Sequence, residues 1–260
     1  MPSRRGLMLG AFSAWVASLV RPAKALADDS PAPGMIAIDD PRYDRFFAAR
    51  TQVWESLGSV DDDVIAYIIS PEFNGGPAWP TTRQAYRVVR PEGSLIIASD
   101  GLSDLFVDTN SPEPGFGCEV YLESPDLADA DFDAVRRSWQ FSLIESFAQN
   151  VAHFGGINER LERLGVISME LPAPLAMPQR WVTDRGTVGA LINIMVPDRP
   201  TQCALEEGMN IRLVALTALL PDETEHVIAG RAAARAEVAG LLVSSGTGLT
   251  SPANRRSVLA

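Results

Sequence analysis

The chain has 260 residues, of which 46% are hydrophobic, so it is long and apolar enough to form one large domain or two small ones. It carries 33 Asp and Glu residues against 22 Lys and Arg residues, which gives a net charge of −11 at pH 7. A surface of that sign repels phosphate backbones, which argues against nucleic acid as a partner.

The first 27 residues have the features of an export signal. Ser3-Arg4-Arg5-Gly6 resembles a twin-arginine motif, and the uncharged run 7–20 that follows is too short to span a bilayer comfortably. Ala25-Leu26-Ala27 fits a cleavage site. We therefore predict a twin-arginine signal peptide and a periplasmic or secreted protein with no stable membrane span once it is removed. A start at Met35 would instead make the protein cytoplasmic.

A proline-rich polar linker is predicted at residues 28–39, before a single domain at 40–243. Asp40-Pro41 is typical of a helix N-cap followed by proline at the first helical position, and Gly58 ends this first helix. Its apolar positions recur at helical spacing: Tyr43, Phe46, Phe47, Val53, Trp54 and Leu57.

Strands dominate the next part of the chain. The acidic run Asp61-Asp62-Asp63 is interpreted as a solvated turn, and the Pro91-Glu92-Gly93 turn joins two strands into a hairpin. In the last strand of this part Val120 and Leu122 alternate with polar neighbours, which is typical of a strand buried on one face. The predicted strands span 64–69, 83–90, 94–99 and 118–123.

The second half mixes long helices with apolar strands. Helices are predicted at 133–154 and 222–241, with a short amphipathic segment at 158–164. The predicted strands are 166–171, 188–196 and 211–220, and a Ser/Gly/Thr-rich tail at 244–260 is predicted to be disordered. The fold class is therefore α+β, with a mostly antiparallel mixed sheet and helices packed against it.

Catalytic motifs are scarce in this sequence. Gly-x-Ser-x-Gly is absent, and the sequence contains only two histidines that could belong to a Ser-His-Asp triad. The carboxylates of Asp104, Asp108 and Glu119 leave two interpretations open. They serve an envelope hydrolase or a cation site, or they bond to the backbone where a strand turns over.

Cys118 and Cys203 either form a disulfide or are two buried thiols. No zinc-site spacing and no cofactor motif is found.

Aromatic residues in or beside loops are candidate interface anchors. The loop 71–80 contains Phe73 and Trp79, which look exposed, and Phe106 and Phe116 flank the acidic loop. The alternative is that each loop folds one aromatic ring inward to close the core.

The run Gly101-Leu-Ser-Asp-Leu-Phe-Val-Asp108, followed by Gly115-Phe-Gly117 and Glu119, resembles the Suppressor of fused family. The segments 139–151 and 213–225 are similar as well. The resemblance implies a protein-binding domain, not an enzyme. In animal members an acidic residue that matches Asp108 contributes to gripping a transcription-factor peptide, and bacterial members resemble immunity or accessory proteins of toxin systems.

The animal members place a tyrosine near the position of Ile97, so the resemblance does not carry over their peptide specificity. We predict a non-catalytic module that binds an unidentified, toxin-like protein in the cell envelope and needs no cofactor or metal. The predicted partner-binding residues are Trp79, Asp104, Phe106, Asp108, Phe116, Glu119 and Tyr121.

Overall fold

The computed structural model describes residues 34–260, so the predicted signal peptide and the start of the predicted linker lie outside the described residues. The helices are α1 Arg42–Glu55, α2 Phe132–Arg136, α3 Trp139–Phe154, α4 Ile157–Leu164 and α5 Pro221–Ser244, with short 3-10 turns η1 Pro71–Asn74, η2 Pro125–Leu127 and η3 Gln179–Trp181. The strands are β1 Ser59–Ala66, β2 Ala85–Arg90, β3 Leu95–Asp100, β4 Cys118–Ser124, β5 Ile167–Pro172, β6 Thr187–Ile192, β7 Gln202–Glu206 and β8 Met209–Leu219.

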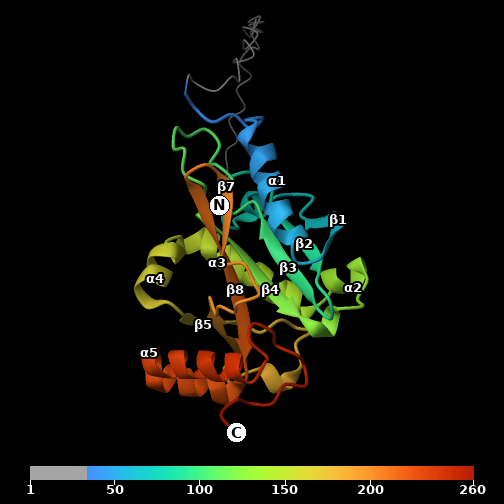
Figure 1. Cartoon of the computed structure of the whole chain (residues 1–260), viewed down its shortest axis with the longest axis vertical. Coiled ribbons are helices and arrows are strands. Elements are labelled where there is room, and N and C mark those ends of the chain that lie inside the picture. Colours follow the sequence, from blue (N-terminus) through green and yellow to red (C-terminus); the bar gives the residue numbers. More distant parts are fainter. Residues whose placement is uncertain (1–33) are drawn as a thin grey trace, which may run out of the picture. The chain divides into compact units, whose positions relative to one another are not determined.

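The strands form one mixed sheet in the order β1-β2-β3-β4-β8-β6-β5, with β7 paired to β8 off this path (Figure 1). Every pair is antiparallel except β4 with β8, which run parallel. The predicted α+β class with a mostly antiparallel sheet is thus confirmed.

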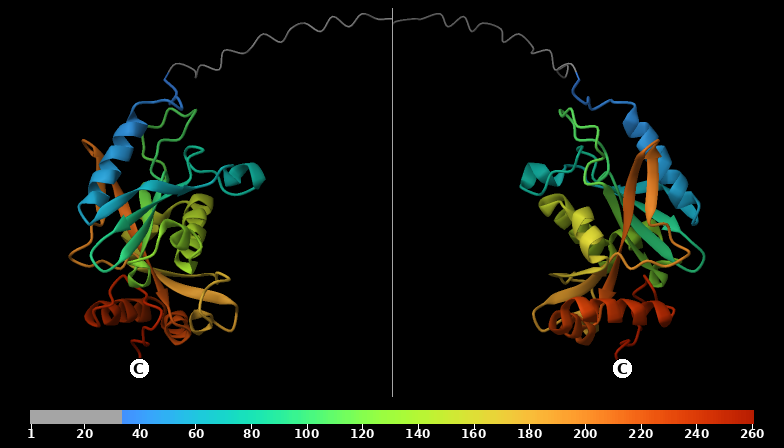
Figure 2. Two further views of the ribbon diagram at one scale, coloured as in Figure 1. Left: turned by 90° about the vertical axis from the view of Figure 1, so that its right-hand side faces the viewer. Right: turned by 60° about the vertical axis from the view of Figure 1, so that its left-hand side comes forward.

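Helices cover both faces of the sheet. One apolar cluster packs α3 against β3, β4 and β8, and a second packs α1 and α5 against the opposite face. Figure 2 shows α1 and α3 on opposite sides of the strands. Side chains therefore alternate between two buried layers along the central strands.

This arrangement corrects the expectation that β4 is half-buried. Val120 and Leu122 face α3 as the alternation indicates, but Tyr121 packs in the layer under α1, and all seven residues of β4 are buried. The polar face of this strand thus carries two acidic residues, Glu119 and Glu123, into the interior. Buried charges require partners. Arg199 pairs with Glu123 at 2.6 Å, and α1 supplies a cation near Glu119.

The two cysteines also lie on opposite sides of the sheet. Cys118 belongs to the cluster under α3 and Cys203 to the cluster under α1, and both thiols are free and buried. The sheet itself separates them, so the disulfide alternative is wrong.

Several predicted bounds also change. The helix expected at 133–154 is two helices, because Asp131 caps α2 and Ser138 caps α3 by accepting hydrogen bonds from backbone N–H groups. The acidic run Asp61–Asp63 lies within β1 and not in a turn. Strand β7 was missed; its alternating Cys203 and Leu205 face inward.

The tail at 244–260 is not disordered within the structure. Leu249, Ser251 and Arg255 are buried. The hydroxyl of Ser251 accepts a hydrogen bond of 3.0 Å from the backbone N–H of Ala218 in β8. The tail therefore packs along the end of the sheet, which composition alone does not reveal.

Candidate functional site

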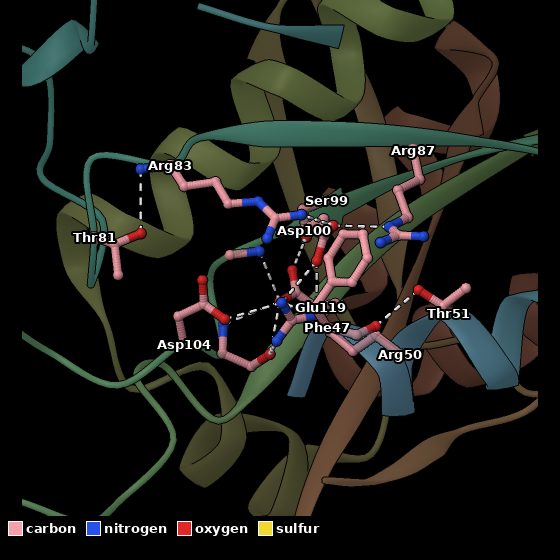
Figure 3. Close-up of polar contacts among 12 residues, drawn as sticks. Phe47, Arg50, Thr51, Thr81, Arg83, Arg87, Ser99, Asp100, Asp104 and Glu119 are labelled. Atoms are coloured by element: carbon pink, nitrogen blue, oxygen red, sulfur yellow. Dashed lines mark hydrogen bonds and ion pairs between the residues drawn. The ribbon is translucent and has the colours of Figure 1, made fainter. Parts of the chain in front are cut away.

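The glycine turn after β3 is closed by a carboxylate from the neighbouring strand. Glu119 Oε1 accepts hydrogen bonds from the backbone N–H groups of Gly101 and Ser103, at 3.1 and 3.0 Å, and from the Ser103 hydroxyl at 2.6 Å. Its Oε2 accepts a bond from Ser99 at 2.5 Å. Figure 3 shows Glu119 and Ser99 beside Arg50 of α1. Glu119 is thus a structural acceptor for the turn.

A fully buried arginine on α1 supplies the positive charge for this region. Arg50 donates from Nε to Asp100 at 2.7 Å and from Nη2 to Asp104 at 2.9 Å (Figure 3). Its Nη1 donates to the Ser103 hydroxyl at 3.1 Å, and Glu119 lies 3.8 Å from its Nε. One guanidinium thus contacts all the acidic groups of the turn through its planar fork.

Asp100 is shared by three arginines. Its Oδ2 accepts bonds of 2.7 Å from both Arg83 and Arg87, while Oδ1 accepts from Arg50. Arg83, which precedes β2, and Arg87 of β2 stack on the ring of Phe47, at 4.4 and 4.0 Å from its centroid. Burial opposes ionisation of Asp100, but the three arginines outweigh it and hold its pKa below the usual range.

Asp104 behaves differently from Asp100. Burial raises the pKa of Asp104 to about 6, against the lowering effect of Arg50, and the nearby charges of Glu119 and Asp100 raise it further. Asp104 therefore titrates near pH 6 inside this buried cluster.

The cluster contains three carboxylates, Asp100, Asp104 and Glu119, and three arginines, Arg50, Arg83 and Arg87, so its formal charge balances. The cation that these carboxylates contact is a side chain of the same chain. Among residues 34–260, no group of three or more His, Cys, Asp or Glu side chains is arranged to hold a metal ion. This arrangement stabilises the fold by joining α1 to the turn after β3.

The structure separates the residues predicted to bind a partner. Asp104 and Glu119 lie in the buried ion cluster, and Trp79 and Tyr121 are also buried. The Tyr121 ring packs edge-on against Trp54 at 5.6 Å. In these four cases the expectation of a contact surface is wrong, because the loops and strands fold these side chains inward.

The loop residues Asp108, Phe106 and Phe116 remain near the surface. Asp108 is exposed and has a positive φ of 59°, while the two phenylalanine rings are half-buried and pack edge-on at 5.5 Å. Gly115 allows this loop to fold back, because a Cβ there would lie 2.4 Å from the carbonyl oxygen of Leu102. Of the predicted set, Asp108 alone is exposed.

An exposed apolar segment begins in the last residues of β1 and was not predicted as a site. Within residues 34–260, five of the thirteen exposed large apolar side chains lie between Val64 and Phe73. Ile68 is 103% exposed, Ile69 63% and Phe73 72%. The segment carries η1 out beyond the sheet (Figure 2). Phe73 was expected at the surface, but the two isoleucines were assigned to a strand.

Arg50 was also missed, although the sequence contains its signal. It lies four residues after Phe46 and four before Trp54, in the centre of the apolar stripe that packs α1 on the sheet. A charged residue in such a position indicates a buried partner of opposite charge. Acidic residues do occur on the sheet face that α1 covers.

Comparisons with protein-family models, curated proteins and solved structures found no match for this chain. No helix among residues 34–260 is long and apolar enough to cross a membrane.

Proposed function

We propose that the chain is a non-catalytic protein-binding module of the bacterial cell envelope, whose partner docks on the apolar segment Val64–Phe73. The exposure of Ile68, Ile69 and Phe73 is the observation that carries the proposal. Concentrated exposed apolar side chains mark interaction sites on soluble proteins, because leaving them in water costs free energy. A partner that covers them recovers that free energy.

The adjacent sheet edge supports an extended partner segment. β1 lies at one end of the strand order and pairs on one side with β2, so its outer backbone groups are available to an added strand. A register shift between Val60 and Val64 and the exposed acids Asp62 and Asp63 discourage indiscriminate pairing. The partner strand expected here therefore carries basic residues beside apolar ones.

Asp108 is retained as a second contact point. The N–H of Val107 donates to the carbonyl oxygen of Pro80 at 3.2 Å, so the loop that bears Asp108 is joined to the end of the segment that follows η1. The resemblance to the Suppressor of fused family, in which an acid at this position grips a peptide, supports the same choice. An immunity protein that binds a toxin stoichiometrically is the sharpest form of the proposal.

The test is affinity capture from the envelope fraction with the tagged full chain, followed by binding measurements with each purified candidate. The variant Ile68→Asp/Ile69→Asp places charge in the proposed interface, and Asp108→Arg reverses the second contact. Leu175→Asp is the matched control, because Leu175 is 108% exposed and lies outside the segment.

We expect one protein to co-purify at near-equal molar amounts with the wild type and with Leu175→Asp. The isoleucine variant should weaken its binding at least a hundredfold without a change in thermal stability, because a charge buried at an interface is strongly disfavoured. Equal recovery with the isoleucine variant would rule out this surface, and no stoichiometric partner for the wild type would overturn the function itself.

A further inference from the structure

A cavity of about 250 Å³ lies between α3, α4, β5 and α5, away from the ion cluster and from the Val64–Phe73 segment. Figure 1 places α4 and β5 beside α3, with α5 below them. The floor is apolar and comes from Phe147, Val151 and Ile157, which are buried. Ile167 and Met169 of β5 form another wall. The interior therefore suits a hydrocarbon chain.

The polar groups of the cavity are positive or neutral. Arg160 of α4 and Arg235 of α5 line it together with Asn150 and Ser168, and none of its lining residues is acidic. The absence of acidic residues from the cavity lining contrasts with the whole chain, which has 33 acidic and 22 basic residues. An anion that enters this cavity meets no like charge on its walls.

Both arginines have unused hydrogen-bonding capacity. Among the described residues, neither forms an ion pair within 4.0 Å. Arg160 donates from Nη2 to the carbonyl oxygen of Gly155 at 2.9 Å, and Arg235 from Nε to that of Val166 at 3.3 Å. These bonds fix the two side chains while most of their N–H groups remain free to bind a carboxylate.

We propose that this cavity binds a medium-chain fatty acid, with its alkyl chain between α3 and β5 and its carboxylate on Arg160 and Arg235. The volume falls below the roughly 300–1,000 Å³ of drug-sized sites, so we expect an alkyl chain of medium length and not a long one. The proposal is independent of the protein-binding function, because it uses different residues on different elements.

The test is isothermal titration calorimetry of the purified full chain with hexanoate, octanoate and decanoate, and with 1-octanol as the uncharged analogue. Each added methylene should raise the affinity about fourfold until the cavity is filled. The alcohol should bind at least tenfold more weakly than octanoate, because it lacks the charge that the arginines recognise.

Three variants separate the two parts of the site. Arg160→Gln and Arg235→Gln should each weaken octanoate binding about tenfold and leave 1-octanol binding unchanged. Arg163→Gln is the control, because Arg163 lies on α4 but does not line the cavity. Met169→Trp should fill the cavity and weaken both ligands.

The proposal is overturned if no fatty acid binds saturably at millimolar concentration, if the alcohol binds as tightly as the acid, or if the two arginine variants behave like Arg163→Gln. Thermal melts of every variant exclude loss of folding as the cause of weaker binding.

Discussion

At the scale of single residues, the molecule depends on a charge placed inside the apolar face of a helix. Arg50 lies between Phe46 and Trp54, and its contacts with Asp100 and Asp104 join α1 to the turn after β3. Burying ions costs free energy that their mutual attraction only offsets when the geometry is good and each donor is used. Here Nε, Nη1 and Nη2 all have acceptors, so the cost is offset.

The first prediction concerns the loss of that charge. Arg50→Met keeps a long side chain but leaves three buried carboxylates with a net charge that Arg83 and Arg87 cannot balance. We expect a loss of about 3–5 kcal/mol in the free energy of unfolding, measured by urea denaturation. Arg45→Met on the same helix is the control, because Arg45 is exposed and should change stability by less than about 0.5 kcal/mol. Similar losses for both variants would contradict the structural role of Arg50.

A second prediction follows from the pKa of about 6 of Asp104. In the unfolded chain this carboxyl titrates near pH ~3.9, so the folded state binds its proton more tightly. The stability from this group is fully present below pH ~4 and is lost as the pH rises through about 6. The variant Asp104→Asn keeps an oxygen acceptor for Arg50 but removes the titration.

The free energy of unfolding of the wild type, minus that of Asp104→Asn, should therefore fall by on the order of 2 kcal/mol between pH 4 and 6.5 and then level off. Asp100, whose pKa is lowered, titrates mostly below this window in both proteins, so it contributes little to the change. Urea unfolding at a series of pH values measures the curve. A difference that rises over this window would mean that ionised Asp104 stabilises the fold.

The sequence was sufficient to find the Gly101–Asp108 turn but not the partners of its side chains. Asp104 and Glu119 were predicted either to meet a partner or a cation or to bond to the backbone of the turn. Glu119 does accept hydrogen bonds from that backbone, and the cation that both carboxylates contact is Arg50, distant in sequence. Which strand face lies under α1 depends on how α1 docks, and a single sequence does not specify that docking. Asp108 lies past the turn and is exposed, whereas Ser103 and Asp104 are buried within it.

At the scale of elements, the tail and α5 form one unit through a buried ion pair. Glu223 in the first turn of α5 accepts bonds of 2.5 and 2.7 Å from the guanidinium of Arg255. The same carboxylate accepts from the N–H groups of Leu220 and Val258, at 2.9 and 3.0 Å. A segment rich in Ser, Gly and Thr is ordered here because specific contacts replace a hydrophobic stripe.

The third prediction tests this tail. Arg255→Met leaves Glu223 buried without its cation, and we expect a loss of about 3–5 kcal/mol in the free energy of unfolding. Arg256→Met, at the next and exposed position, should have little effect. Denaturant unfolding measures both, and hydrogen exchange should show faster exchange of the 248–260 amides in the first variant alone. Unchanged protection in Arg255→Met would show that the tail is ordered by other contacts.

Element types were more predictable than their environment. Apolar periodicity located α1 and the central strands, and a capping-box-like start located α5, because those patterns depend on local sequence. The division into α2 and α3 depends on the cap formed by Ser138, which lies inside a continuous helical pattern. The burial of β4 on both faces depends on α1, which lies on the far side of the sheet from α3, and the alternation of side chains alone cannot indicate that second layer.

At the scale of the whole molecule, the acidic charge and the proposed export signal concern how and where the proposed partner is met. Residues 1–27 contain Arg4, Arg5, Arg21 and Lys24 and no acids, so their removal would change the net charge from −11 to −15. The proposed partner is basic and extended, and a strongly acidic protein attracts such a partner at long range. The proposed export signal then determines where the two proteins meet.

The last prediction tests the proposed export signal. Arg4→Lys/Arg5→Lys keeps the charge of the N-terminal region but removes the arginine pair that a twin-arginine receptor reads, so the protein should remain in the cytoplasm at its full length. Arg21→Lys, outside the pair, should still be exported and shortened by the segment ending at Ala27. Cell fractionation with mass spectrometry of the N-terminus measures both outcomes. Export of the double variant, or a wild-type protein that begins at Met35, would contradict the signal and would move the search for the partner to the cytoplasm.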